Sequence, residues 1–136
     1  MKKLVRLALR LVGVVLLLLL AVVLWSGGKG YYDALGDSDV LAARANRLIE
    51  DDRGGASLGT DHLAMLIEVQ DPGFKVHKGV DLTTPGAGLT TITQSLAKRL
   101  AFDDFQPGFA KIRQTGYALG LEARLNKDEI LALWLN

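Results

Sequence analysis

The sequence has no cysteine, only two histidines and three prolines, and a formal net charge of +1. Without cysteine there are no disulfides and no thiolate metal sites, so thiols give no information about the compartment. A nearly neutral chain lacks the basic surface that binds nucleic acid, and we expect no nucleic-acid partner. The compartment and the partner have to be inferred from other features of the sequence.

A long apolar run is the first of these features. Four basic residues precede it: Lys2, Lys3, Arg6 and Arg10. The 15 residues 11–25 span roughly 22 Å of a hydrocarbon core about 30 Å thick. If Arg10 extends its guanidinium to the headgroups, the helix reaches back to Leu7, and about 19 residues can cross the membrane. Trp25 then lies at the far interface as an aromatic anchor.

This run predicts a single-pass signal-anchor in the cytoplasmic (inner) membrane. Positive charge stays inside, so the N-terminus is cytoplasmic and the rest lies on the extracytoplasmic or periplasmic side. The alternative is a cleaved signal peptide, with the small residues after Trp25 as a weak cleavage site. The sequence SGGKG at residues 26–30 predicts a flexible glycine-rich hinge. We therefore divide the chain into 1–30, with the basic tip, anchor and hinge, and an exported domain at 31–136.

The exported domain is predicted to be mainly α. Apolar residues recur at helical spacing in five segments. Their approximate ranges are 38–50, 60–70, 90–100, 109–125 and 127–135. Ser38, Thr60 and Thr90 are the predicted N-caps of the first three segments, and Asn126 with Glu129 forms a predicted capping box before the last. No convincing alternation of apolar and polar residues predicts a sheet.

The fourth predicted helix carries an unexpected polar stripe. The helix is mostly apolar, but four residues share one face: Lys111, Gln114, Ala118 and Glu122. A polar stripe on a buried helix must face other polar groups. Gln94 and Lys98 share a face of the preceding predicted helix, because they are four residues apart.

Three segments in order resemble the motifs of glycosyltransferase family 51, the peptidoglycan polymerases. The first family motif, E-D-x-x-F-x-x-H-x-G, is matched by Asp71, Phe74, His77 and Gly79, with Asp81 following. The second, G-x-S-T-I-T-Q-Q-x-x-K-N, is matched by Gly88, Thr91, Ile92, Thr93, Gln94 and Lys98. The third, R-K-x-x-E, is matched by Lys111, with Ala118 and Glu122 at the later family positions. The segment NKDEILALWLN then resembles the family's SKDEILELYLN, so the resemblance covers residues 63–136.

The resemblance implies a fold, a reaction and partners. The expected fold is an N-terminal transmembrane helix followed by a truncated, lysozyme-like all-α glycosyltransferase domain. The family polymerises lipid II with inversion, extends a nascent glycan chain, and works with other cell-wall synthesis proteins. Lys98 and Lys111 would bind the pyrophosphate leaving group, and a divalent cation, Mg or Mn, is a possible helper. The resemblance implies no metal-ligating residue of the protein itself.

The two glutamates of the family motifs are both replaced. Gln70 and Gln114 stand at these catalytic positions, and an amide neither titrates nor carries charge. Neither side chain can serve as a general base. Asp71 is the candidate replacement base, and the alternative is an aspartate that only caps the turn.

The other motif residues are expected either to bind the substrate or to support the fold. The expected substrate-binding residues are Phe74, His77, Thr91, Gln94, Lys98 and Lys111. The expected structural support comes from Gly79 and Glu122. For His77 the alternative is a hydrogen bond within its loop, and for Phe74 it is core packing. For Gln94 with Lys98 the alternative is a solvated helix face.

Three functions remain open from the sequence. The first is a membrane-anchored peptidoglycan glycosyltransferase, and the second is an inactive protein that holds lipid II for a partner polymerase. The third is an envelope interaction domain without a glycan site. Because family domains continue beyond the last matched segment, we also expect a fragment or a truncated frame of marginal stability.

Overall fold

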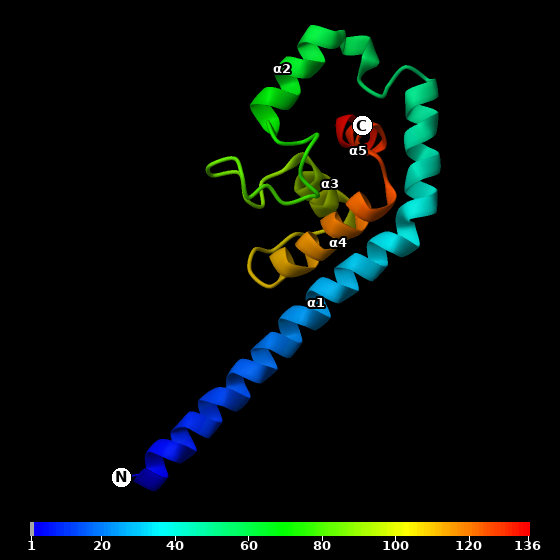
Figure 1. Cartoon of the computed structure of the whole chain (residues 1–136). Coiled ribbons are helices and arrows are strands. Elements are labelled where there is room, and N and C mark those ends of the chain that lie inside the picture. Colours follow the sequence, from blue (N-terminus) through cyan, green and yellow to red (C-terminus); the bar gives the residue numbers. More distant parts are fainter. Residues whose placement is uncertain (1) are drawn as a thin grey trace.

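The computed structural model describes residues 2–136 and contains five α-helices and one short 3₁₀ helix in that range. In chain order these are α1 (Lys2–Glu50), η1 (Ala56–Leu58), α2 (Thr60–Gln70), α3 (Ile92–Ala101), α4 (Ala110–Arg124) and α5 (Lys127–Leu135). Figure 1 shows α1 extending far beyond a cluster formed by the other helices. Over the same residues there is no strand, only an isolated antiparallel bridge between Asp81 and Gly88. The prediction of a mainly α chain with a long apolar N-terminal helix is confirmed.

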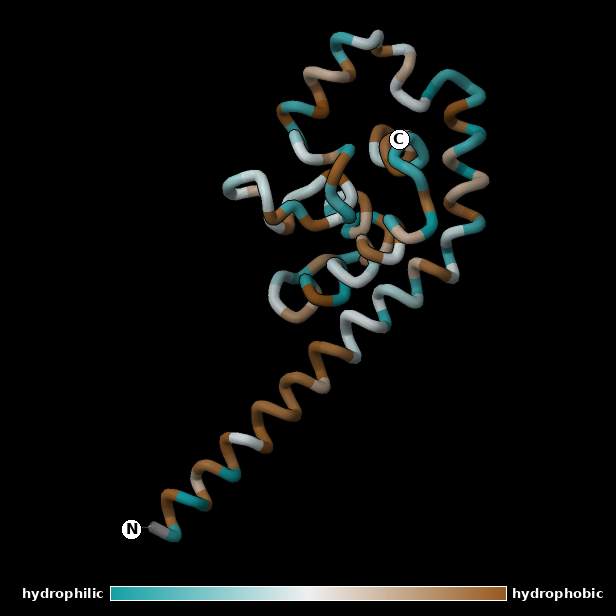
Figure 2. Tube along the Cα trace, in the orientation of Figure 1, coloured by the Kyte–Doolittle hydropathy of each residue, from teal (hydrophilic) through white to brown (hydrophobic). Residues whose placement is uncertain are grey.

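The first half of α1 is apolar and exposed, and it is long and apolar enough to cross a membrane. Figure 2 shows this apolar stretch as an arm that extends away from the other helices. The second half of α1 packs on the rest of the chain and bends in direction (Figure 1). Within that half, Ser38 donates its hydroxyl hydrogen to the Leu35 carbonyl at 2.7 Å, a contact that favours bending of a helix. Ser38 is therefore inside α1 and is not an N-cap.

The glycine-rich hinge predicted at residues 26–30 is wrong. These residues are helical, and α1 passes without a break through the boundary placed at residue 30. The glycines instead allow close packing of α1 against α4. A Cβ atom on Gly30 would collide with the Arg113 carbonyl oxygen, and one on Gly116 would collide with the Gly27 carbonyl oxygen. The missing side chains bring two helix backbones into contact.

The core lies where the second half of α1 meets α4 and α5. Its α1 residues recur at helical spacing: Ala34, Leu41, Ala45 and Leu48. They pack in one cluster with Leu121 of α4 and with Ile130 and Leu131 of α5. The helix predicted from residue 38 to 50 is therefore the end of a much longer one.

Two of the predicted N-caps are displaced by one residue. Helix α2 is preceded by Gly59, so Thr60 is its first residue and not its cap. Helix α3 is capped by Thr91, whose Oγ1 accepts from the Gln94 N–H at 3.2 Å. Thr90 instead donates to the Ala87 carbonyl at 2.6 Å within the preceding turn. In each case the first residue of the helix is the one that follows the observed cap, and its N–H group is among those that have no partner inside the helix.

The capping box before α5 is confirmed. Asn126 Oδ1 accepts from the Glu129 N–H at 2.9 Å, and Glu129 Oε2 accepts from the Asn126 N–H at 2.8 Å. Glu129 Oε1 also accepts from Asn46 Nδ2 of α1 at 3.3 Å. The same side chain therefore starts α5 and links it to the long helix.

Candidate functional site

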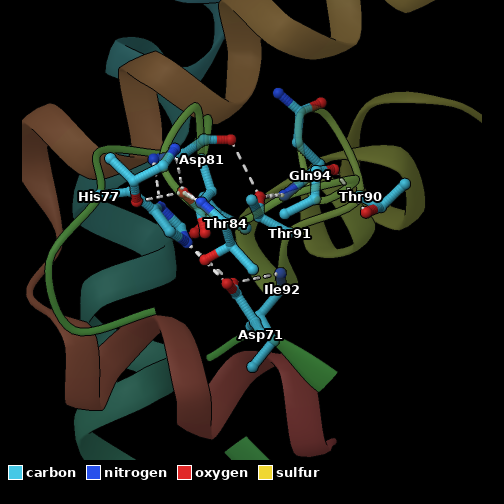
Figure 3. Close-up of polar contacts among 12 residues, drawn as sticks. Asp71, His77, Asp81, Thr84, Thr90, Thr91, Ile92 and Gln94 are labelled. Atoms are coloured by element: carbon cyan, nitrogen blue, oxygen red, sulfur yellow. Dashed lines mark hydrogen bonds and ion pairs between the residues drawn. The ribbon is translucent and has the colours of Figure 1, made fainter. Parts of the chain in front are cut away.

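Asp71 links the end of α2 to the beginning of α3. Its side chain is buried, with 2% of its surface exposed. Both carboxylate oxygens lie 2.9 Å from His77 Nε2, and Oδ2 also accepts from the Ile92 N–H at 2.9 Å (Figure 3). Ile92 is the first residue of α3, where free N–H groups and the helix dipole both favour a negative charge. Asp71 is thus bonded from two sides.

His77 has a defined tautomer in this arrangement. The Gly79 N–H lies 3.0 Å from His77 Nδ1, and a backbone N–H can only donate, so Nδ1 accepts. The ring hydrogen is therefore on Nε2 and is donated to Asp71. The His77 carbonyl accepts from Lys127 Nζ at 2.8 Å, and that ammonium lies 4.6 Å from the centre of the buried Phe74 ring. The side chains of His77 and Phe74 both pack inside the loop between α2 and α3.

Asp81 orders the next part of the same loop. Its Oδ1 accepts from Thr83 N at 2.8 Å, Thr83 Oγ1 at 2.7 Å and Thr84 N at 2.9 Å. These hydrogen bonds from Thr84 and Thr83 hold the pKa of Asp81 well below its usual range. Gly79, whose φ of 88° is in the left-handed region, turns the chain toward Thr91 and accepts from its hydroxyl at 2.9 Å.

The polar stripe of α4 faces α3 and the loop before it. Lys111 Nζ donates to the Leu89 carbonyl at 3.0 Å, and Gln114 Nε2 donates to the Gln94 carbonyl at 2.6 Å. Further along α4, Glu122 accepts a hydrogen bond from the side chain of Thr93 in α3. The three contacts explain why polar residues are spaced along one face of a mostly apolar helix.

Glu122 is the acceptor at the centre of a buried polar contact. Its Oε1 accepts from Thr93 Oγ1 at 2.5 Å and from Lys127 Nζ at 2.7 Å. The side chain of Glu122 is 3% exposed, so the ion pair compensates for its burial. Lys127 was not predicted as a site residue. The sequence signal that could have indicated Lys127 is its position five residues after Glu122, at the start of the next helix.

Two buried glutamine side chains keep polar atoms free of protein contacts. Gln94 and Gln114 are 1% and 2% exposed. Within residues 2–136, Gln94 Oε1, Gln94 Nε2 and Gln114 Oε1 have no hydrogen-bond partner. Buried polar atoms are nearly always paired, so these three are exceptions among the described residues. Figure 3 shows the Gln94 amide directed away from Asp71.

Lys98 and Lys111 form the cationic part of the site. Burial lowers the pKa of Lys111, and the nearby charge of Lys98 lowers it further. Lys98 is exposed, with Nζ 5.0 Å from the centre of the Phe105 ring. An anionic group at this position would relieve the repulsion between the two ammonium groups.

The two glutamines predicted to replace the family's glutamates lie in different environments. Gln70 is exposed at the last position of α2, whereas Gln114 is buried on α4 and bonded to α3. The sequence presents them as an equivalent pair. The structure gives only Gln114 a part in packing.

The donor set fits a divalent cation poorly. Within the described residues there is no group of three or more His, Cys, Asp or Glu side chains that could hold a metal ion. The side chains expected at the pyrophosphate are the two lysines, which offer no oxygen ligand. Magnesium in proteins usually takes one or two carboxylates together with substrate phosphates.

A family comparison agrees with the motif positions. The family model described as Transglycosylase matches residues 56–136, which is more than half of the chain. The match confirms the resemblance to glycosyltransferase family 51. No curated protein and no solved structure gives a significant match.

Proposed function

This chain belongs to the transglycosylase family, and we propose that it binds lipid II at the membrane during cell-wall glycan synthesis without turning it over. The family implies glycosyltransferase-type activity in general and a peptidoglycan-type substrate. The proposal is narrower than the family activity because it depends on the ionisable groups present in this chain.

The observation that carries the proposal is the state of the buried carboxylates. A general base must be ionisable, and it must come within hydrogen-bond reach of the proton that it removes. Gln70 and Gln114 cannot ionise. Asp71 is buried and bonded to His77 and Ile92, and Glu122 is bonded to Thr93 and Lys127.

The groups needed to bind lipid II, in contrast to a general base, are present. The free amide atoms of Gln94 and Gln114 suit sugar hydroxyls or acetamido groups, and Lys98 and Lys111 suit a pyrophosphate. These residues come from α3 and α4, which pack on each other. Rigid helices hold binding groups more precisely than loops do.

The proposed place of action follows from α1. Its apolar half would cross the cytoplasmic membrane with the basic tip inside, so the domain would lie on the extracytoplasmic side. Lipid II and the nascent glycan chain would reach the domain there. A partner polymerase would then supply the turnover.

The test uses full-length protein in phosphatidylcholine liposomes with fluorescent lipid II. We expect lipid II to bind and no glycan chains to form. Chains formed by the wild-type protein would overturn the binding proposal in favour of the enzyme. Absence of lipid II binding would leave the third function, an interaction domain without a glycan site.

A single substitution probes the missing base. Gln70→Glu restores a carboxylate at an exposed position, and Gln70→Asn is the matched control without charge. We expect lipid II binding in both variants, and chain formation in Gln70→Glu alone if the base is all that is missing. Gln114→Glu is unsuitable for this purpose, because its carboxylate would face the Gln94 carbonyl.

A further inference from the structure

The two cationic side chains of the site are held in different ways. Lys111 Nζ donates to the Leu89 carbonyl at 3.0 Å, so a hydrogen bond fixes its position. Lys98 is exposed and, within the described residues, forms no salt bridge with a carboxylate. Its ammonium instead contacts an aromatic ring, with Nζ 5.0 Å from the centre of Phe105. For Lys98 the ring takes the place of a hydrogen-bond acceptor.

Repulsion between like charges works against this arrangement. The charge of Lys98 adds to the effect of burial in lowering the pKa of Lys111. A lysine side chain has many rotamers, and repulsion favours those that point away from another ammonium. An attraction is therefore needed to keep Lys98 beside Lys111. The negative face of a phenyl ring attracts a cation within about 6 Å of its centre, and Phe105 is at that range.

A second ring holds the ring of Phe105 in place. Phe102 and Phe105 are packed edge to face, with ring centres 5.2 Å apart and planes at 87°. Phe102 follows the last residue of α3, and Phe105 is in the loop between α3 and α4. Both side chains are half-buried. Edge-to-face pairs are a favoured arrangement of aromatic rings, so the pair gives the loop a fixed point beside Lys98.

The contacts continue from Phe102 to α4 and α1. Arg113 Cζ lies 5.2 Å from the centre of the Phe102 ring, and Arg113 Nη2 donates to Asp33 Oδ2 at 3.0 Å. Cations and rings therefore alternate along one series of contacts: Asp33, Arg113, Phe102, Phe105 and Lys98. The exposed lysine of α3 is in this way connected to the two helices that pack most extensively on each other.

We propose that Phe105 is a positioning residue that holds the ammonium of Lys98 beside Lys111, so that both cations face the same anionic group. The inference rests on the proposed function, in which the two lysines bind the pyrophosphate of lipid II. It adds a residue from the loop at 102–109, which none of the matched motifs covers. Cations that are already in place bind an anion more tightly, because less side-chain freedom is lost on binding.

The test is graded fluorination of one ring in the full-length protein in detergent micelles. Phe105 is replaced by 4-fluoro-, 3,4,5-trifluoro- and pentafluorophenylalanine, which weaken the negative face of the ring in steps. The probe is inorganic pyrophosphate, and titration calorimetry measures its Kd. We expect the affinity to fall in steps, by about two- to fivefold for the pentafluoro ring.

Phe109 is the matched control for this series. It is in the same loop and exposed, and within the described residues no cation lies over its ring. The same substitutions at Phe109 should leave the Kd unchanged. Constant or rising affinity along the Phe105 series, or an equal fall in both series, would overturn the proposal. Absence of pyrophosphate binding by the wild type would overturn it too, because Lys98 would have no anion to meet.

The titration of Lys111 reports the position of Lys98 without any ligand. If the ring keeps Lys98 close, pentafluorophenylalanine at position 105 should raise the pKa of Lys111 toward its ordinary value. Nuclear magnetic resonance of ¹³C-labelled lysine measures this change. Lys98→Met should give the same rise, and the two changes together should give no further rise. A further rise in the combined variant would overturn the positioning role, because the ring would then act on Lys111 through burial.

Two ordinary substitutions test the same point. Phe105→Trp provides a ring face that attracts cations more strongly, and it should retain pyrophosphate binding. Phe105→Leu keeps an apolar side chain without a ring, and it should lose about two- to fivefold in affinity. Equal affinities would overturn the proposal. Circular dichroism checks that both variants remain helical.

The lipid II assay keeps the two proposals distinguishable. Lipid II binding that is the same in Phe105→Leu and the wild type would remove this inference alone. A stepwise fall in pyrophosphate affinity, with no binding of lipid II, would remove the proposed function alone.

Discussion

Two buried polar regions of this protein differ in how well they are satisfied. In the aspartate loop, residues 71–84, three of the four carboxylate oxygens of Asp71 and Asp81 accept hydrogen bonds, and the fourth, Asp81 Oδ2, has no partner within residues 2–136. In the amide pair, Gln94 and Gln114, three of the four side-chain polar atoms have no partner within residues 2–136. The difference supports a scaffold role for the loop and the proposed ligand contact at the amide pair.

The contrast has a physical cause. A buried carboxylate is stable only when its charge is compensated, so the loop folds around it with N–H and hydroxyl donors. A neutral amide costs less to bury without partners. Variants of the two regions should therefore behave differently.

Asp71→Ala should have the largest effect on stability. It leaves the Ile92 N–H and the His77 Nε2–H buried without an acceptor, and we expect a loss of about 3 kcal/mol in unfolding free energy. The measurement is denaturation in detergent micelles, followed by far-ultraviolet circular dichroism. Asp39→Ala, an exposed aspartate of α1, is the control and should cost less than about 0.5 kcal/mol. Equal losses in the two variants would contradict the scaffold role.

Gln114→Glu should destabilise by about 1–3 kcal/mol at neutral pH. The carboxylate would replace an N–H donor opposite the Gln94 carbonyl, so two acceptors would face each other. Protonation of the new side chain restores a donor, and the loss should shrink as the pH falls. The same denaturation at pH 7 and pH 4 measures this, with Gln70→Glu, at an exposed position, as control. A loss independent of pH would show that the amide hydrogen bond is not the cause.

Asp81 should contribute a pH-dependent part of the stability. Its folded-state pKa is below the unfolded value, so its contribution is complete above about pH 4 and is lost as the pH falls toward the folded value. The difference in denaturation midpoint between the wild type and Asp81→Asn should therefore narrow from pH 6 to pH 2. A constant difference over that range would mean that the Thr83 and Thr84 bonds do not favour the charged form.

Gln70→Glu should have the smallest effect on stability. The residue is exposed, and a negative charge at the last position of α2 costs only about 0.5 kcal/mol through the helix dipole. The measurement is the same denaturation series at pH 7. A loss as large as that of Gln114→Glu would contradict the different environments of the two glutamines.

Much of the helical structure could be predicted, because its signals are local. The α5 capping box joins residues only three apart, and the core face of α1 is a simple repeat of apolar positions. The apolar run and its basic flank need no tertiary contact to indicate a membrane helix. Motif positions were predicted for the same reason, since they are spacings along the chain.

Contacts between distant segments decided the rest. The sequence alone determined where helices form, which faces are apolar, and that Gln70 and Gln114 cannot ionise. Only the tertiary structure decided that Gly27 and Gly30 pack against α4, that Asp71 bonds to α3, and that Gln94 keeps a free amide. The physical reason is that backbone conformation depends on near neighbours, whereas burial and hydrogen-bond partners depend on residues that folding brings together.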